Sequence, residues 1–139
     1  MKLEAATRKN TDFRRVLYTA PHSQLVLMCI PPGDEIGEET HLLSDQFFRI
    51  ESGEGHVDIN GHIHLVEDGS AVIVPAGALH NVINSSSTKP LKLYTLYSPP
   101  HHRDGVVAAT KAEAEANSEH FGGHLSEQVP KKNSIKKSR

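Results

Sequence analysis

Three residues in a short stretch of this chain have the types and spacing that could bind a metal ion. Glu39 and His41 lie two residues apart, so on an extended strand they point to the same side, whereas Glu38 points to the other. Gln46 comes five residues after His41, and it can join them only if the chain turns in between. A Ser-Asp pair directly before Gln46 favours such a turn.

A fourth candidate, His80, follows a Pro-Ala-Gly sequence typical of a tight turn. Together the four residues would supply two imidazoles, one carboxylate and one amide oxygen. That set suits a divalent Mn, Fe, Co, Ni or Zn ion, and it leaves positions open for water or substrate. The alternative interpretation is a group of surface polar residues at the end of a sheet, with His80 held by hydrogen bonds.

The elements that must position these residues are β-strands. From residue 14 to residue 98, short runs rich in Val, Ile, Leu, Tyr and Phe alternate with turn residues, which indicates an all-β sandwich or barrel. The pair Asn60-Gly61 is a strong hairpin signal. A two-residue loop would place Ile59 opposite His62 on one face, so we expect either a longer loop or a pairing at the edge of a sheet.

The C-terminal part of the chain has a different pattern. Ala, Glu and Lys are dense from Lys111 to about His120, and Thr110 with Glu113 matches a capping box, so we expect one short helix. Residues 1–121 then form a single domain with a flanking N-terminal segment, and residues 122–139 form a disordered basic tail.

Composition excludes several classes of function. The net charge is -2, and five of the fifteen basic residues lie in residues 130–139, so the folded body is acidic and nucleic-acid binding is disfavoured. No apolar run has the roughly 18 residues that a membrane helix needs, and no secretory signal is evident, so we expect a cytoplasmic location. Cys29 is the only cysteine, which excludes an intrachain disulfide and a thiolate metal cluster within one chain.

The four candidate ligands lie at fixed spacings within two sequence motifs. The first consists of a glycine, five residues, Glu39-Thr40-His41, four residues, Gln46, six residues and a glycine. The second consists of a glycine, five residues, Pro-Ala-Gly, two residues, His80, three residues and an asparagine. These spacings resemble the two motifs of the cupin superfamily, and the glycines, proline and asparagine that fall in register are Gly33, Gly53, Gly69, Pro75, Gly77 and Asn84.

The resemblance implies a jelly-roll β-barrel with a metal ion at its mouth, bound by Glu39, His41, Gln46 and His80. Two of these positions depart from the common pattern, because Glu39 stands where the first histidine usually is and Gln46 where the glutamate usually is. The set keeps one carboxylate, although an amide is the weaker ligand. Gln at that position also occurs in cupins similar to the small enzyme that linearises unsaturated uronates.

Three functions remain open at this point. The chain resembles cupins of the mannose-6-phosphate isomerase-like group, so the leading hypothesis is a metal-dependent enzyme that isomerises or opens the ring of a small polar substrate such as a sugar or sugar acid. The alternatives are an Fe-dependent dioxygenase and a non-catalytic binding or sensing module. Small cupins commonly pair, so we also expect a homodimer.

Further residues are candidates for the substrate pocket. Phe48 shares strand parity with Gln46, although core packing explains it equally well. His101 and His102 follow the last strand and could cover the mouth, although a solvated loop is the alternative. Tyr94 and Tyr97 have opposite parity, so at most one of them faces the interior.

Overall fold

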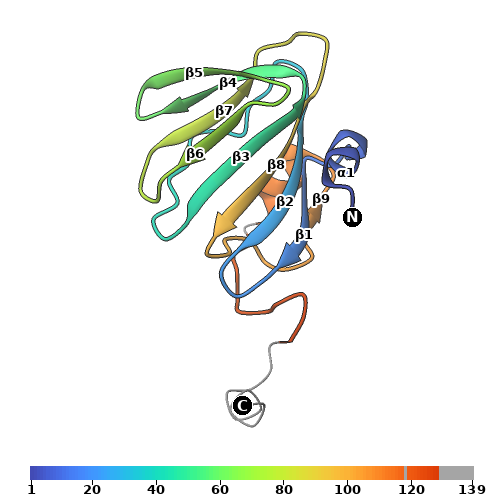
Figure 1. The fold of residues 1–139 in the computed structure, drawn as a ribbon, viewed down its shortest axis with the longest axis vertical. Coiled ribbons are helices and arrows are strands. Elements are labelled where there is room, and N and C mark those ends of the chain that lie inside the picture. Colours follow the sequence, from blue (N-terminus) through green and yellow to red (C-terminus); the bar gives the residue numbers. More distant parts are fainter. Residues whose placement is uncertain (118, 129–139) are drawn as a thin grey trace.

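The computed structural model describes residues 1–117 and 119–128, and most of its ordered elements are antiparallel strands that form two sheets. The larger sheet has six strands in the order β6-β3-β8-β2-β1-β9, and the smaller has three in the order β5-β4-β7 (Figure 1). The elements in chain order are α1 (Leu3–Lys9), β1 (Arg14–Thr19), β2 (Gln24–Ile30), β3 (Asp45–Ser52), β4 (Glu54–Ile59), β5 (His62–Glu67), β6 (Ala71–Val74), β7 (His80–Asn84), β8 (Leu91–Ser98), β9 (Val107–Ala108) and α2 (Lys111–Ala116).

The two sheets enclose one apolar core, and the side chains that face it become polar toward one end of the barrel. Cross-strand pairing places Ile50, Leu93 and Met28 in one inward row. At the other end of the same strands, the inward row is Gln46, Tyr97 and Gln24. Buried polar groups require hydrogen-bond partners or ligands, so this end of the barrel is the place to look for a site.

Asn84, the asparagine of the second motif, is the last residue of β7 and connects neighbouring segments of the barrel. The Asn84 side-chain amide donates to the carbonyl oxygens of Ile30, Pro31 and Lys89 at 2.9–3.1 Å, and its Oδ1 accepts from Ser86 N at 2.9 Å. One buried side chain thereby joins the end of β2 to the loop before β8. The asparagine of the motif therefore has a structural role in this chain.

The hairpin expected at Asn60-Gly61 has the two-residue loop. Ile59 pairs with His62, Asn60 has a φ of +51° and Gly61 a φ of +85°, as a type I′ turn requires. Apolar Ile59 lies beside polar His62 because β5 is an edge strand and is exposed along most of its length. Of the two expectations, the edge pairing is confirmed and the longer loop is wrong.

The helices differ from the sequence expectations. The sequence pattern does not predict α1. This helix packs beside β8 and β3, and Lys92 Nζ of β8 donates to Arg8 O of the helix at 2.6 Å. The expectation that α2 reaches about His120 is wrong, because Asn117 is extended and both its backbone and side-chain N–H groups bond to Glu113 O. The predicted N-cap is present, since Thr110 Oγ1 accepts from Glu113 N at 3.2 Å.

The part of the chain after α2 contacts the barrel in its described portion. Ser126 exchanges two hydrogen bonds with Thr19, at 2.8 and 3.0 Å, so the chain at this residue lies beside the end of β1. The rest of the expected disordered tail, residues 129–139, lies outside the described residues. Within residues 1–117 and 119–128, neither helix has the length and apolar character needed to cross a membrane.

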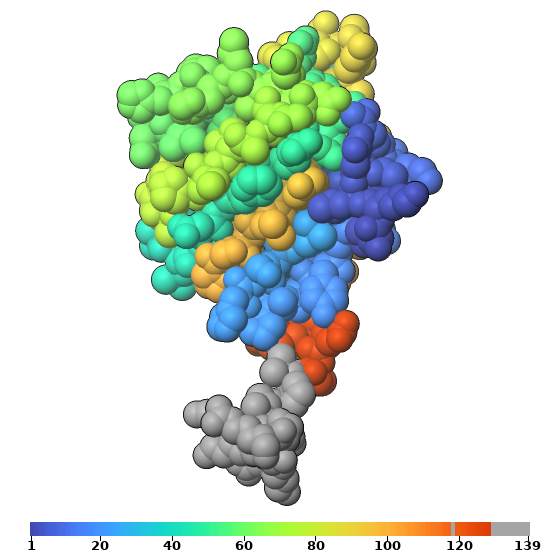
Figure 2. Space-filling view, viewed as in Figure 1, coloured from blue at the N-terminus to red at the C-terminus, as the bar shows by residue number. Residues whose placement is uncertain are grey.

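The outer face of the six-stranded sheet carries an apolar row beside α1. Cross-strand pairing aligns one outward side chain from each of five adjacent strands, and bands of β6, β3, β8 and β2 are visible on this face (Figure 2). The members are Ile73, Phe47, Leu96, Leu25 and Tyr18, of which Ile73 and Tyr18 are exposed. The homodimer expected from the sequence stays a prediction.

Gly53 of the first motif allows a test of the fold. Its φ is +95°, and an added Cβ would lie 2.5 Å from Pro90 O, whereas Gly69 has a φ of +89° with open space around it. Gly69→Ala should cost about 1–2 kcal/mol for the backbone conformation alone, and Gly53→Ala about 1–3 kcal/mol more for the clash. Urea unfolding of both variants measures this difference, and equal losses would show that the backbone of Pro90 moves away freely.

Candidate metal centre

The loop between β2 and β3 brings Glu39 to His80. Residues 33–39 run antiparallel beside β7, and Glu39 and His80 exchange two backbone hydrogen bonds at 2.8 and 2.9 Å. Because directly paired residues project from the same face, both side chains point toward the mouth of the barrel. Backbone hydrogen bonds thus join the two motifs, independently of their side chains.

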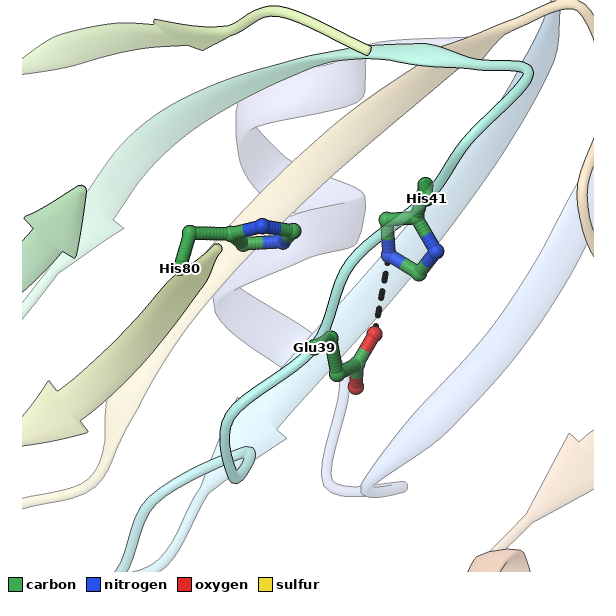
Figure 3. A group of neighbouring side chains, drawn as sticks. All are labelled: Glu39, His41 and His80. Atoms are coloured by element: carbon green, nitrogen blue, oxygen red, sulfur yellow. Dashed lines mark ion pairs between the residues drawn. The ribbon is translucent and has the colours of Figure 1, made fainter. Parts of the chain in front are cut away.

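His41 is held next to Glu39 as the strand parity predicted. Its Nε2 lies 2.8 Å from Glu39 Oε2 (Figure 3). Gly77 N donates to His41 O at 2.8 Å. Glu38, on the opposite side, is exposed. The ligand atoms of Glu39, His41 and His80 all lie within 4.8 Å of one another, so the three residues could share one metal ion.

Gln46 completes the group because the chain bends at Leu42 and Leu43, slightly earlier than the predicted Ser-Asp pair. Strand β3 begins at Asp45, whose carboxylate accepts from Ala76 N at 2.9 Å and so fixes the start of β3 beside the turn that precedes His80. Gln46 Oε1 then lies 3.2 Å from His80 Nε2, while Gln46 Nε2 donates to Thr95 Oγ1 at 3.0 Å. All four predicted residues therefore lie around one point.

The hydrogen bonds of His80 leave a lone pair aimed into this group. Its Nδ1 lies 3.0 Å from Ala78 O, which is only an acceptor, so in the neutral ring Nδ1 carries the proton. Nε2 then faces Gln46 Oε1 with two lone pairs opposed, and a cation between them would satisfy both. Rotating the Gln46 amide would replace this arrangement with a hydrogen bond donated to His80 Nε2, and the Thr95 hydroxyl would then donate to Gln46 Oε1.

The electrostatics also favour a cation at this point. Burial lowers the pKa of His80, and the charge of His41 adds to that effect. Burial alone would raise the pKa of Glu39, but the contact with His41 and the charges of Arg14 and His80 leave that pKa below its usual range. A neutral imidazole and an ionised carboxylate are the forms that bind metal, so the residues present fit a divalent ion.

His101 and His102 also lie at this centre, and the solvated-loop alternative is wrong for both. The ring of His101 is 4.1 Å from that of His41 between centroids, and it stacks on Tyr97 at 5.3 Å. His102 is buried, with Nε2 3.2 Å from the Tyr97 hydroxyl. Of the two tyrosines left open by parity, Tyr97 is therefore the one that faces the interior. Phe48 is a buried core residue whose ring lies 6.3 Å from that of His80.

A buried glutamine holds these two histidines in place. Gln24 Oε1 accepts from His101 N at 3.2 Å and His102 N at 2.9 Å, and Gln24 Nε2 donates to His102 O at 2.7 Å and Thr19 Oγ1 at 3.0 Å. Sequence reasoning missed Gln24. The available signal was its position as the polar first residue of an otherwise apolar strand.

Two cavities flank His101 and give the centre two different surroundings. The first, of about 270 Å³, is mostly polar and reaches Glu39 and Arg14. The second, of about 620 Å³, reaches His41 and is lined mainly by apolar side chains, among them Leu42, Pro99 and Phe121. Sequence reasoning missed Arg14 as well, because it lies outside both motifs.

Two histidines, a carboxylate and an amide gathered at the mouth of a two-sheet barrel make this chain a small β-barrel with a candidate metal site. The cupin domain family matches residues 26–97, which is more than half of the chain, and the protein belongs to the cupin family.

Two relatives and one solved structure are similar to this chain at more than 40% identity. The chain is 46% identical over 122 residues to the uncharacterized protein YrkC of Bacillus subtilis, covering 84% of this chain and 65% of that one. It is 41% identical to an uncharacterized protein of Acanthamoeba polyphaga mimivirus, covering 78% and 69%. The crystal structure of BH2720 from Bacillus halodurans superposes with a TM-score of 0.82 at 42% identity, covering 84% and 92%. The chain thus spans about two thirds of the two curated relatives.

The buried side chain of His102 predicts that the fold loses stability in acid. Burial lowers the pKa of His102 to about 2, so below pH 6.5 the unfolded chain binds a proton that the folded chain does not. As the pH falls from 6.5 toward 2, this one residue should reduce the free energy of unfolding by up to about 1.4 kcal/mol per pH unit.

Urea titrations of EDTA-treated protein at pH 7, 6 and 5 measure that slope. His102→Gln, which cannot titrate, should flatten it, whereas the exposed-site variant His62→Gln should not. Identical slopes for the wild type and His102→Gln would contradict the assignment.

Proposed function

We propose that this cupin is a metal-dependent enzyme in which Glu39, His41, Gln46 and His80 hold one divalent transition-metal ion next to a small polar substrate. The convergence of three ligand atoms within 4.8 Å at the mouth of the barrel is the observation that carries this proposal. When bound, the ion would polarise a carbonyl or hydroxyl oxygen of the substrate. Isomerisation or ring opening of a sugar or sugar acid is the reaction class that this chemistry favours.

The residues around the centre have separable tasks in this proposal. Glu39 supplies the only carboxylate of the ligand set, and Gln46 contributes an amide oxygen without adding charge. Tyr97 and His102 bond to each other, so their polar atoms are already paired inside the barrel. His101 stands between the two cavities, where it excludes water from one side of His41 and defines where a substrate can approach.

Metal analysis tests the site directly. Protein purified without a nickel column should contain or take up about one equivalent of Mn, Fe, Co, Ni or Zn, as measured by inductively coupled plasma mass spectrometry. His80→Ala removes a direct ligand, so it should weaken binding at least about 100-fold, more than the loss of a supporting group would. Gln46→Glu should retain the metal, because it restores a second carboxylate.

His64→Ala is the matched control, since His64 is an exposed histidine on β5 away from the centre. Uptake below about a tenth of an equivalent by the wild type would refute the site. Equal losses in His64→Ala and His80→Ala would show that the effect is not specific to the centre.

An iron-dependent dioxygenase is the second candidate function. Two imidazoles with one carboxylate and open positions are the ligand set typical of non-haem Fe(II) oxygenases, and Glu39, His41 and His80 have that composition. Gln46, as a neutral ligand, leaves the net charge of such a set unchanged. The two candidates differ in whether they need oxygen and iron.

We expect turnover of a sugar or sugar acid by Zn- or Mn-loaded protein under nitrogen, because isomerisation and ring opening involve no net oxidation. A panel of aldoses and uronates, followed by NMR of the products, provides the measurement. Activity that requires Fe(II) and consumes dissolved oxygen on an electrode would favour the dioxygenase. Tight binding of a panel member without turnover by any metal form would favour a binding or sensing module.

A further inference from the structure

Arg14 extends its side chain from the inner face of the larger sheet into the lining of the polar cavity. It is the first residue of β1 and pairs with Met28 and Ala108, both buried, so its side chain leaves from the inner face of the sheet. Its Nε is buried and has no hydrogen-bond acceptor, and its contact with Phe13 is a ring contact, at 5.6 Å from the centroid. Burying a charged donor without an acceptor is costly, so an acceptor is expected to bind there.

The cavity beside Arg14 also reaches the metal centre. Its volume is about 270 Å³, and its lining includes Arg14, Glu39 and His101. The second cation in this lining, Lys111, is already paired with Asp34 at 3.2 Å. Within the part of the chain that the structure describes, no ion pair joins Arg14 to a carboxylate. Arg14 is therefore the cation of this cavity that remains available to a ligand.

We propose that Arg14 binds a carboxylate of the substrate while a neighbouring oxygen of the same molecule lies at the metal centre. This inference rests on the proposed function and narrows its substrate class to small hydroxy, keto or sugar acids. A guanidinium presents parallel N–H donors that match the two oxygens of a carboxylate. A phosphate usually requires several donors, and here a single guanidinium is available. The cavity volume also suits a small acid better than a large ligand.

The next residue along the chain offers a matched control. Arg15 lies on the opposite face of β1, is exposed, and pairs with Asp12 at 3.3 Å. Arg14→Gln and Arg15→Gln therefore remove the same charge from adjacent positions of one strand. Only the first removes it from the cavity.

Calorimetric titration with glycolate and glycolamide tests the proposal, because the two molecules share a hydroxyl and differ in the carboxylate. Zn-loaded wild type should bind glycolate about 10- to 100-fold more tightly than glycolamide. Arg14→Gln should abolish this preference, Arg14→Lys should keep part of it, and Arg15→Gln should keep all of it. Equal binding of the two probes by the wild type, a preference that survives in Arg14→Gln, or tighter binding of inorganic phosphate than of glycolate would overturn the proposal.

A second measurement does not depend on the metal or on the stability of a variant. In ¹⁵N-labelled, metal-free wild type, the Arg14 Nε–H resonance should shift on addition of glycolate and stay unchanged with glycolamide. That result without any Zn uptake would support Arg14 as an acid-binding residue and refute the proposed metal-dependent function. Zn uptake together with an Arg14 resonance that does not shift on addition of glycolate would support the metal site and refute the acid-binding role of Arg14.

Discussion

The two backbone hydrogen bonds between Glu39 and His80 are the constraint on which the centre depends. They belong to a longer run in which Gly33, Ile36 and Glu39 donate to Ser86, Val82 and His80 in turn, so a segment without regular strand structure lies along β7. Backbone pairing is insensitive to side-chain identity. The ligand positions can therefore change from His to Glu or from Glu to Gln while the residues still arrive at the same point.

The second constraint is the dehydration of this end of the barrel. Gln24, Gln46, Thr95 and His102 are all nearly or fully buried, and each makes hydrogen bonds inside the protein. Such a network is rigid, because moving one member leaves another buried group unsatisfied. Gln24 thus ties the loop that carries His101 to the end of β2. Rigidity of this kind is what a site needs to hold ligands without reorganising.

Much of this arrangement was predictable from local rules. Strand parity selected Glu39 over Glu38, because side chains alternate along an extended segment. A bend before β3 returned Gln46 to the same side, although it lies at Leu42 and Leu43 and not at the predicted Ser-Asp pair. The positions of Tyr97 and Arg14 required the strand register and the path of the chain after β8, which depend on contacts far apart in the sequence. The sequence does not predict helix α1, because its seven residues are too few to show a helical period. Helix α2 ends earlier than expected because the Asn117 side chain bonds to the Glu113 carbonyl.

The position of His101 between an apolar cavity and a cavity that contains Arg14 has a stereochemical consequence. A flat substrate group bound at the proposed metal centre would have one face toward the cavity lined by Leu42, Pro99 and Phe121 and the other toward the cavity lined by Arg14. Its two faces are then energetically inequivalent, although the group itself is symmetric. In the proposed enzyme, a proton or another atom delivered from only one of the two cavities would arrive on one face only, so a single enantiomer would form at a prochiral carbon.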